Sequence, residues 1–355
     1  MTMKNVVVVG ILGISILAHA PLVGRWIHRI KATPLIPSIE TFWSNTPDKA
    51  HYTLSNTCLR AWALFYRFDK ELLMKEQLPK NLSFRYSTET VDSAILSSQM
   101  QELIQELLTI REHPKDFAHF KILKDNDFNY LRSCGVIILK FKDYPFVVKL
   151  FRETPETFVE PFGKGLLPDL FWGMGGGMTR FLAGFTRIRN KDAVEAKLKE
   201  SPKWANQISL PRKWFWIPPN VPWFTVIGHN LNSHELMIEY PSLYCIVCDE
   251  MKSEREFSIS NEEDRKTALE LSNFLGNRLD PHICNFFIEK GTGKIALVDT
   301  EHFASMLGLE EEIHFKSYTD WIIKLARKCL RGSLFRNKKE RLDTLTSPIP
   351  ANLVL

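Results

Sequence analysis

A short apolar hairpin in the C-terminal third constrains the fold of this chain more than any other feature. One apolar run covers residues 286–288, a Lys-Gly-Thr-Gly turn follows at 290–293, and a second apolar run covers 295–298. Two such runs joined by a glycine-containing turn predict a pair of antiparallel strands. The residue before the first strand then lies beside the residue after the second strand. Asn285 and Asp299 should therefore meet, on strands about 4.8 Å apart.

Asn285 and Asp299 are chemically suited to bind a divalent cation. An amide oxygen and a carboxylate are ligands for Mg²⁺, which binds few protein groups and takes other ligands from substrate phosphates. Asp280 lies slightly earlier, in the loop that leaves a predicted helix. That helix should begin at a capping box, Ser260-x-x-Glu263, and end near Gly276. We expect Asp280 to face an incoming hydroxyl group.

A second hairpin is predicted upstream. Apolar runs at 136–141 and 146–151 are joined by a short turn at 142–145, which indicates antiparallel strands. Lys149 lies in the middle of the second strand. It can either face solvent in an alternating strand, which is the commoner situation for a lysine, or direct its ammonium group into a cleft.

The order of these elements resembles the protein-kinase-like superfamily. The stretch Asp280-Pro-His-Ile-Cys-Asn285 is similar to the D-x-H-x-x-N loop of its aminoglycoside phosphotransferase, choline kinase and lipopolysaccharide kinase branch. Asp299 follows an apolar hairpin, as the metal-binding aspartate of that superfamily does. The resemblance covers about residues 121–330. It implies an α+β, two-lobed kinase-like fold that uses ATP and Mg²⁺.

The resemblance also implies roles for single residues. Asp280 would accept the proton of the acceptor hydroxyl, and Asn285 and Asp299 would hold Mg²⁺. Lys149 would contact the ATP phosphates. Glu195, in the helix-like segment 192–198, would be the carboxylate partner of that lysine.

Further elements of the nucleotide site are expected on the same basis. Gly135 is the glycine available for a phosphate-covering loop, which usually contains several glycines. Segments 223–227 and 235–241 resemble the two strands that follow the lysine strand and its helix. The second would run into a hinge at Glu239 and Tyr240, whose backbone would contact adenine.

The implied activity is transfer of the γ-phosphoryl group of ATP to a hydroxyl group of a small molecule, sugar or lipid. The absence of a protein-kinase activation segment after 302–303 argues against protein substrates. The alternative is a catalytically inactive pseudokinase that binds a nucleotide or a protein partner. The sparse glycine loop and the motif Asp299-Thr300-Glu301 favour the pseudokinase, whereas retention of the four site residues favours the enzyme. A structural protein without a nucleotide site is the third possibility.

The N-terminus predicts a membrane segment. Residues 5–24 carry no charge and are long enough to span a bilayer. The basic residues within 25–31 outnumber Lys4, which favours an anchor with the kinase-like part in the cytoplasm. Ala-His-Ala at 18–20 resembles a signal-peptidase site and leaves export after cleavage as the alternative, although Pro21 fits such a site poorly. A buried helix is the third interpretation.

These signals divide the chain into four parts. Residues 1–31 are a signal-anchor or transmembrane segment, 32–120 a helical extension, 121–241 a kinase-like N-lobe and 242–355 a kinase-like C-lobe. The formal net charge of +5 is too small for this length to indicate a nucleic-acid partner. The glycine-rich segment 173–177 lacks the Gly-Lys-Ser/Thr of a phosphate-binding loop and is expected to be an inserted loop.

Overall fold

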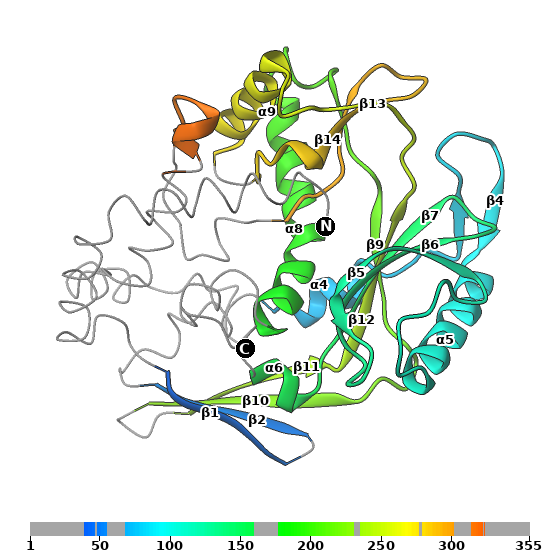
Figure 1. Ribbon diagram of the computed structural model, residues 1–355, viewed down its shortest axis with the longest axis vertical. Coiled ribbons are helices and arrows are strands. Elements are labelled where there is room, and N and C mark those ends of the chain that lie inside the picture. Colours follow the sequence, from blue (N-terminus) through cyan, green and yellow to red (C-terminus); the bar gives the residue numbers. More distant parts are fainter. Residues whose placement is uncertain are drawn as a thin grey trace.

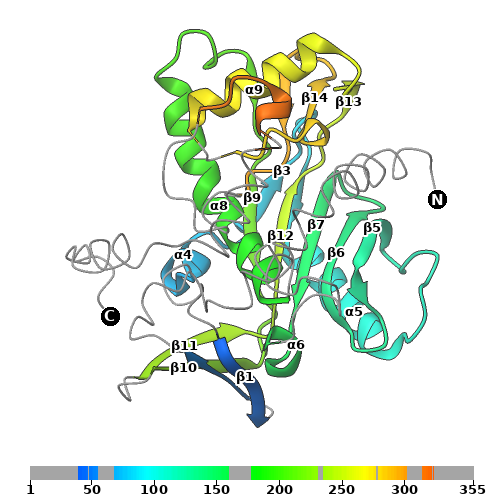
Figure 2. The same ribbon diagram turned by 60° about the vertical axis from the view of Figure 1, so that its left-hand side comes forward.

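The computed structural model describes residues 39–46, 48–54, 68–159, 177–230, 235–276, 279–301, 314–321 and 323 (Figure 1). This part of the chain is α+β, which is the class that the kinase-like resemblance implies. Helix α8 (Gly177–Lys199) runs through the middle of the described structure, with sheets at both of its ends and along its side (Figures 1 and 2).

The central sheet is antiparallel throughout and has five strands. Their order is β5 (Phe120–Asn129), β6 (Cys134–Phe141), β7 (Phe146–Arg152), β12 (Leu243–Asp249) and β9 (Lys213–Trp216). One face packs against α5 (Ser93–Thr109), and the opposite face packs against α8. The predicted hairpin that carries Lys149 is confirmed as β6 and β7.

A second sheet brings together strands from distant parts of the sequence. Its order is β1 (Ile39–Thr46), β2 (Lys49–Leu54), β10 (Trp223–Asn230) and β11 (Glu235–Pro241), with β2 parallel to β10. The segments at 223–227 and 235–241 are therefore strands, but the expectation that they join the lysine-bearing sheet is wrong. β9 and β12 take those places. β12 has seven consecutive buried residues, as a strand covered on both faces requires, whereas Met237 and Glu239 of β11 are exposed.

The C-terminal sheet consists of β13 (Ser253–Glu256), β14 (Phe286–Glu289), β15 (Ile295–Leu297) and β8 (Ile208–Ser209), covered by α9 (Glu262–Leu275). The register of β14 and β15 confirms the hairpin predicted from the sequence. The N-cap of α9 is Asn261 instead of Ser260, because the Asn261 side chain accepts hydrogen bonds from the backbone N–H groups at 263 and 264. Gly276 ends the helix in a left-handed conformation.

The region 32–120 is not purely helical, so this expectation is corrected. It contributes β1 and β2, then α4 (Lys70–Lys75), the two-stranded ladder of β3 (Asn81–Ser83) and β4 (Thr90–Asp92), and α5. Apolar residues at helical spacing over 97–111 predict a helix from the sequence, and α5 confirms that helix. The sequence pattern did not indicate β1 and β2, which form a hairpin with each other, and only β2 pairs with the distant strand β10. Two short elements complete the description, α6 (Pro155–Val159) and a 3₁₀ turn, η2 (Ile283–Asn285).

The predicted membrane segment, residues 5–24, lies outside the described residues, as do residues 160–176 with most of the glycine-rich stretch. Within the described ranges, every helix is too short or too polar to cross a bilayer.

Candidate functional site

Two lysines lie on the face of the central sheet that packs against α8. Side chains alternate along a strand, so Lys149 shares this face with Phe151 in β7, and Lys213 shares it with Phe215 in β9. The Lys149 side chain is 13% exposed and Lys213 is 4% exposed. Of the two orientations left open for Lys149, the structure has the inward one.

The carboxylate of Asp299, just after β15, accepts four hydrogen bonds. Lys149 Nζ donates to Oδ2 at 3.1 Å. Arg187 of α8 donates through Nε to Oδ1 at 2.9 Å and through Nη2 to Oδ2 at 3.3 Å. The backbone N–H of Glu301 donates to Oδ1 at 3.0 Å, and the Glu301 carboxylate also binds Arg187. Asp299 thus links the central sheet, α8 and the C-terminal hairpin.

Lys213 binds the residues on both sides of Asp299. Its Nζ donates to the carbonyl oxygen of Val298 at 3.1 Å and to Thr300 Oγ1 at 2.7 Å. The Thr300 hydroxyl donates to the carbonyl of Arg187, and the side-chain amide of Asn190 donates to the carbonyl of Thr300. The loop 298–300 is therefore fixed to the sheet and to the helix.

Burial and charge shift the pKa values of this cluster in opposite directions. Burial raises the pKa of the Asp299 carboxyl, but the positive charges of Arg187, Lys149 and Lys213 outweigh it and hold that pKa well below its usual range. Burial and the neighbouring Lys149 charge lower the pKa of Lys213 to about 7. Asp299 is therefore ionised at neutral pH.

Asp280 and Asn285 approach the same region from the loop before β14. Asn285 Nδ2 donates to the backbone carbonyl of Asp280 at 3.2 Å, and the Val298 N–H donates to the carbonyl of Asn285 at 3.1 Å. Burial raises the pKa of Asp280 to about 7, and the negative charges of Glu301 and Asp299 add to this effect. The expected meeting of Asn285 with the Asp299 end of the hairpin is confirmed.

Three expected site residues lie elsewhere. Glu195 is half-exposed and binds Lys191 at 3.7 Å, so its expected pairing with Lys149 is wrong. It lies eight residues beyond Arg187, or about 12 Å along α8 at 1.5 Å per residue. Arg187, one of the helix residues that does face the site, pairs with Asp299 and Glu301 instead.

The expected hinge at Glu239 and Tyr240 is also wrong. Glu239 is exposed on β11, where its carboxylate is 3.4 Å from Lys70. Tyr240 is fully buried among the rings of Phe68, Phe158 and Phe224. Both residues belong to the β1–β2–β10–β11 sheet, and the connection out of the central sheet is the end of β12 at Asp249.

Gly135 has a structural reason to be glycine. Its φ is +107°, and a Cβ atom there would lie 2.2 Å from the backbone oxygen of Asp127 on the paired strand. The tight approach of β5 and β6 thus excludes a side chain. A contact between this turn and phosphates stays a prediction.

Sequence reasoning missed Arg187 and Lys213. Neither residue belongs to a recognisable motif. Periodicity predicts which face of its helix or strand each residue occupies, but a role in the site follows only once the element that packs on that face is known. The strand pattern Lys-Trp-Phe-Trp contains a signal for Lys213, because alternation places this residue on the same face as Phe215.

Asp299 and Asn285 have the ligand types that Mg²⁺ binds, a carboxylate and an amide oxygen. Lys149 and Arg187 already donate to both oxygens of Asp299, so a cation could bind there only if one of these contacts were given up. Within the described ranges, no group of three or more His, Cys, Asp or Glu side chains is arranged to hold a metal ion by itself.

Comparison with known proteins leaves the site to be interpreted from its geometry, because neither a protein-family model nor a curated protein sequence matches this chain.

Proposed function

We propose that this chain is an ATP-dependent phosphotransferase of the protein-kinase-like type, acting on a hydroxyl group of a small molecule, sugar or lipid. One observation carries the proposal. Lys149 of the central sheet forms an ion pair with Asp299, at the end of the hairpin where Asp280 and Asn285 also converge. This pairing of Lys149 with Asp299, beside the loop that carries Asp280 and Asn285, supports a kinase-like site.

The residues have distinct roles in this proposal. Asp280 accepts the proton of the acceptor hydroxyl, for which a pKa of about 7 is suitable. Lys149 exchanges its contact with Asp299 for the phosphates of the nucleotide. Asn285 and Asp299 would hold Mg²⁺, which, when bound, neutralises charge on the transferred phosphoryl group. Arg187 keeps the carboxylates of Asp299 and Glu301 in place.

The test is phosphoryl transfer from ATP by the full chain to a panel of sugars, amino alcohols and lipids, in wild type and in Asp299→Asn. We expect the substitution to lower kcat by a factor of about 100 or more, since such catalysis consists mainly of positioning and charge neutralisation. Asp192→Asn, an exposed aspartate on α8, is the matched control and should keep full activity. Full activity in Asp299→Asn would disprove the mechanism.

The second candidate is a pseudokinase that binds nucleotide without turnover. It is favoured by the four hydrogen bonds that Asp299 already accepts. Thermal unfolding with ATP, with and without Mg²⁺, separates the candidates. Stabilisation by ATP without hydrolysis would favour the pseudokinase, and no stabilisation in either condition would exclude both.

A further inference from the structure

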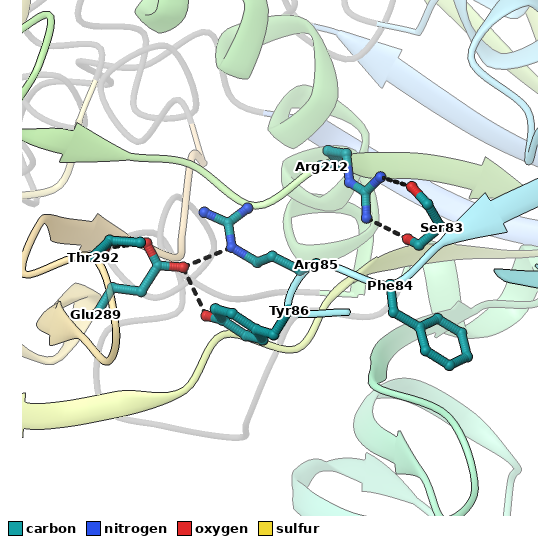
Figure 3. Close-up of a pocket in the computed structure, with 7 residues that line it drawn as sticks. All are labelled: Ser83, Phe84, Arg85, Tyr86, Arg212, Glu289 and Thr292. Carbon is teal, nitrogen blue, oxygen red and sulfur yellow. Dashed lines mark hydrogen bonds and ion pairs between the residues drawn. The ribbon is translucent and has the colours of Figure 1, made fainter. Parts of the chain in front are cut away.

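The loop between β3 and β4 places Arg85 and Tyr86 against the C-terminal sheet (Figure 3). Arg85 Nε donates to Glu289 Oε1 at 2.6 Å. Its Nη1 donates to the carbonyl of Leu210 at 3.0 Å and to Asp249 Oδ2 at 3.4 Å, and its Nη2 donates to the Ser209 hydroxyl. Arg85 is therefore bound to strand ends from two sheets.

The partners of Arg85 come from both sheets, and two of them, Leu210 and Asp249, lie where the chain passes between the sheets. Asp249 is the last residue of β12 in the central sheet, and Glu289 is the last residue of β14 in the C-terminal sheet. Both carboxylate side chains are 0% exposed. Tyr86 donates its hydroxyl to Glu289 at 2.7 Å and accepts from the backbone N–H of Lys252, in the connection between β12 and β13, at 3.0 Å.

A second arginine completes this Arg85 network, which we define as Arg85, Tyr86, Arg212, Asp249 and Glu289. Arg212 donates to Asp249 through Nε at 2.9 Å and Nη2 at 2.7 Å. Its Nη1 and Nη2 also reach the hydroxyl and carbonyl of Ser83, at the end of β3. Two arginines thus balance two buried carboxylates.

A cavity of about 420 Å³ adjoins the network, yet the network is not arranged as a ligand site. The two carboxylates and two guanidinium groups that line or adjoin it already bind one another. Each buried side-chain nitrogen and oxygen of the network has a hydrogen-bond partner among the described residues. A ligand would have to displace these contacts, whereas a structural connection needs them all satisfied.

We propose that Arg85 is a positioning residue that fixes the orientation of the C-terminal sheet relative to the central sheet. The candidate site takes Lys149 from one sheet and Asp280, Asn285 and Asp299 from the loops of the other. A change in the angle between the sheets moves these groups apart, and small displacements of reacting groups strongly reduce rates. The effect on catalysis rests on the proposed phosphotransferase function, but the mechanical role does not.

The test compares Arg85→Lys with Arg255→Lys by hydrogen–deuterium exchange of the full chain. Arg255 makes a similar two-point contact with one carboxylate, Asp264, at 2.7 and 2.8 Å, but within the C-terminal part. We expect Arg85→Lys to speed exchange about tenfold at residues 249–252 and 298–301, because lysine replaces a forked donor with a point charge. Arg255→Lys should leave both segments unchanged. Tyr86→Phe, which removes one hydroxyl, should act in the same direction as Arg85→Lys.

Each outcome decides the proposal. Unchanged exchange in both Arg85→Lys and Tyr86→Phe, or faster exchange at 249–252 alone, would overturn it. If Arg85→Lys does not fold, the proposal is tested by the exchange of Tyr86→Phe in the same two segments. If both segments loosen and wild type transfers phosphate, kcat should fall at least tenfold with KM little changed. If both loosen and wild type has no turnover, the positioning role stands and the proposed function fails.

Discussion

At the scale of single residues, Asp299 is the centre of the candidate site. Its carboxylate and that of Glu301 both bind Arg187, and the positive charges of Lys149 and Lys213 also act on Asp299. Such a buried cluster is stable only while each charge keeps its partner, since an isolated charge in a low-dielectric interior is costly.

Arg187→Met should therefore destabilise the protein strongly. The variant keeps much of the side-chain volume but leaves Asp299 and Glu301 with fewer counter-charges, at a cost of about 3–5 kcal/mol. Urea unfolding followed by circular dichroism measures the change. Arg189→Met, an exposed arginine on the same helix, is the control and should differ from wild type by about 0.5 kcal/mol or less. Equal stability of the two variants would contradict this account of the cluster.

At the scale of elements, strand periodicity explains most of what the sequence revealed. The hairpins β6–β7 and β14–β15 consist of apolar runs with short turns, so local pattern predicts both. Because side chains alternate along a strand, the sequence predicts that Lys149 and Phe151 lie on one face of the sheet. It does not predict which element covers that face. That α8 presents Arg187 there depends on packing.

The start of β6 allows a direct test of backbone geometry. Gly135→Ala should cost about 3 kcal/mol, because the added methyl meets the Asp127 carbonyl and alanine disfavours a φ of +107°. Gly291→Ala separates the two causes, since its φ is +85° with nothing within 4 Å, and should cost about 1 kcal/mol. Chemical denaturation measures both, and a Gly135→Ala cost no larger than that of Gly291→Ala would show that β5 and β6 do not approach so closely.

At the scale of the whole molecule, the arrangement of the sheets depends on contacts between distant segments. Strands β1 and β2 complete the sheet of β10 and β11, and the β3–β4 loop joins the central and C-terminal sheets. The described parts of the segment expected to be a helical extension thus belong to the same fold as the candidate site.

The connection between these sheets should weaken in acid. Burial alone would raise the pKa of Glu289, but hydrogen bonds from Arg85, Ser209, Tyr86 and Thr292 lower it to about 2. A carboxyl whose pKa is depressed on folding contributes stability that is complete above its unfolded pKa, about 4.3, and is lost as the pH falls towards 2.

We expect the difference in unfolding free energy between wild type and Glu289→Gln to be largest above about pH 5 and to shrink steadily between pH 5 and pH 2. Denaturant titrations at a series of pH values measure it. Glu254→Gln, on the exposed strand β13, is the control and should differ little from wild type in unfolding free energy. A pH-independent difference for Glu289→Gln would contradict the depressed pKa.

The sequence by itself determined the two hairpins, helices α5 and α9, and the meeting of Asn285 with the hairpin end that carries Asp299, because these follow from periodicity and short-range pairing. Tertiary structure alone decided that β12 pairs with the lysine strand, that β9 pairs with β12, and that Glu195, Glu239 and Tyr240 lie away from Lys149. It also decided that Arg187, Lys213 and Arg85 form contacts between elements that lie far apart in the sequence. Side-chain partners across sheets depend on which faces pack together, and the free energy of that packing is spread over residues far apart in the sequence.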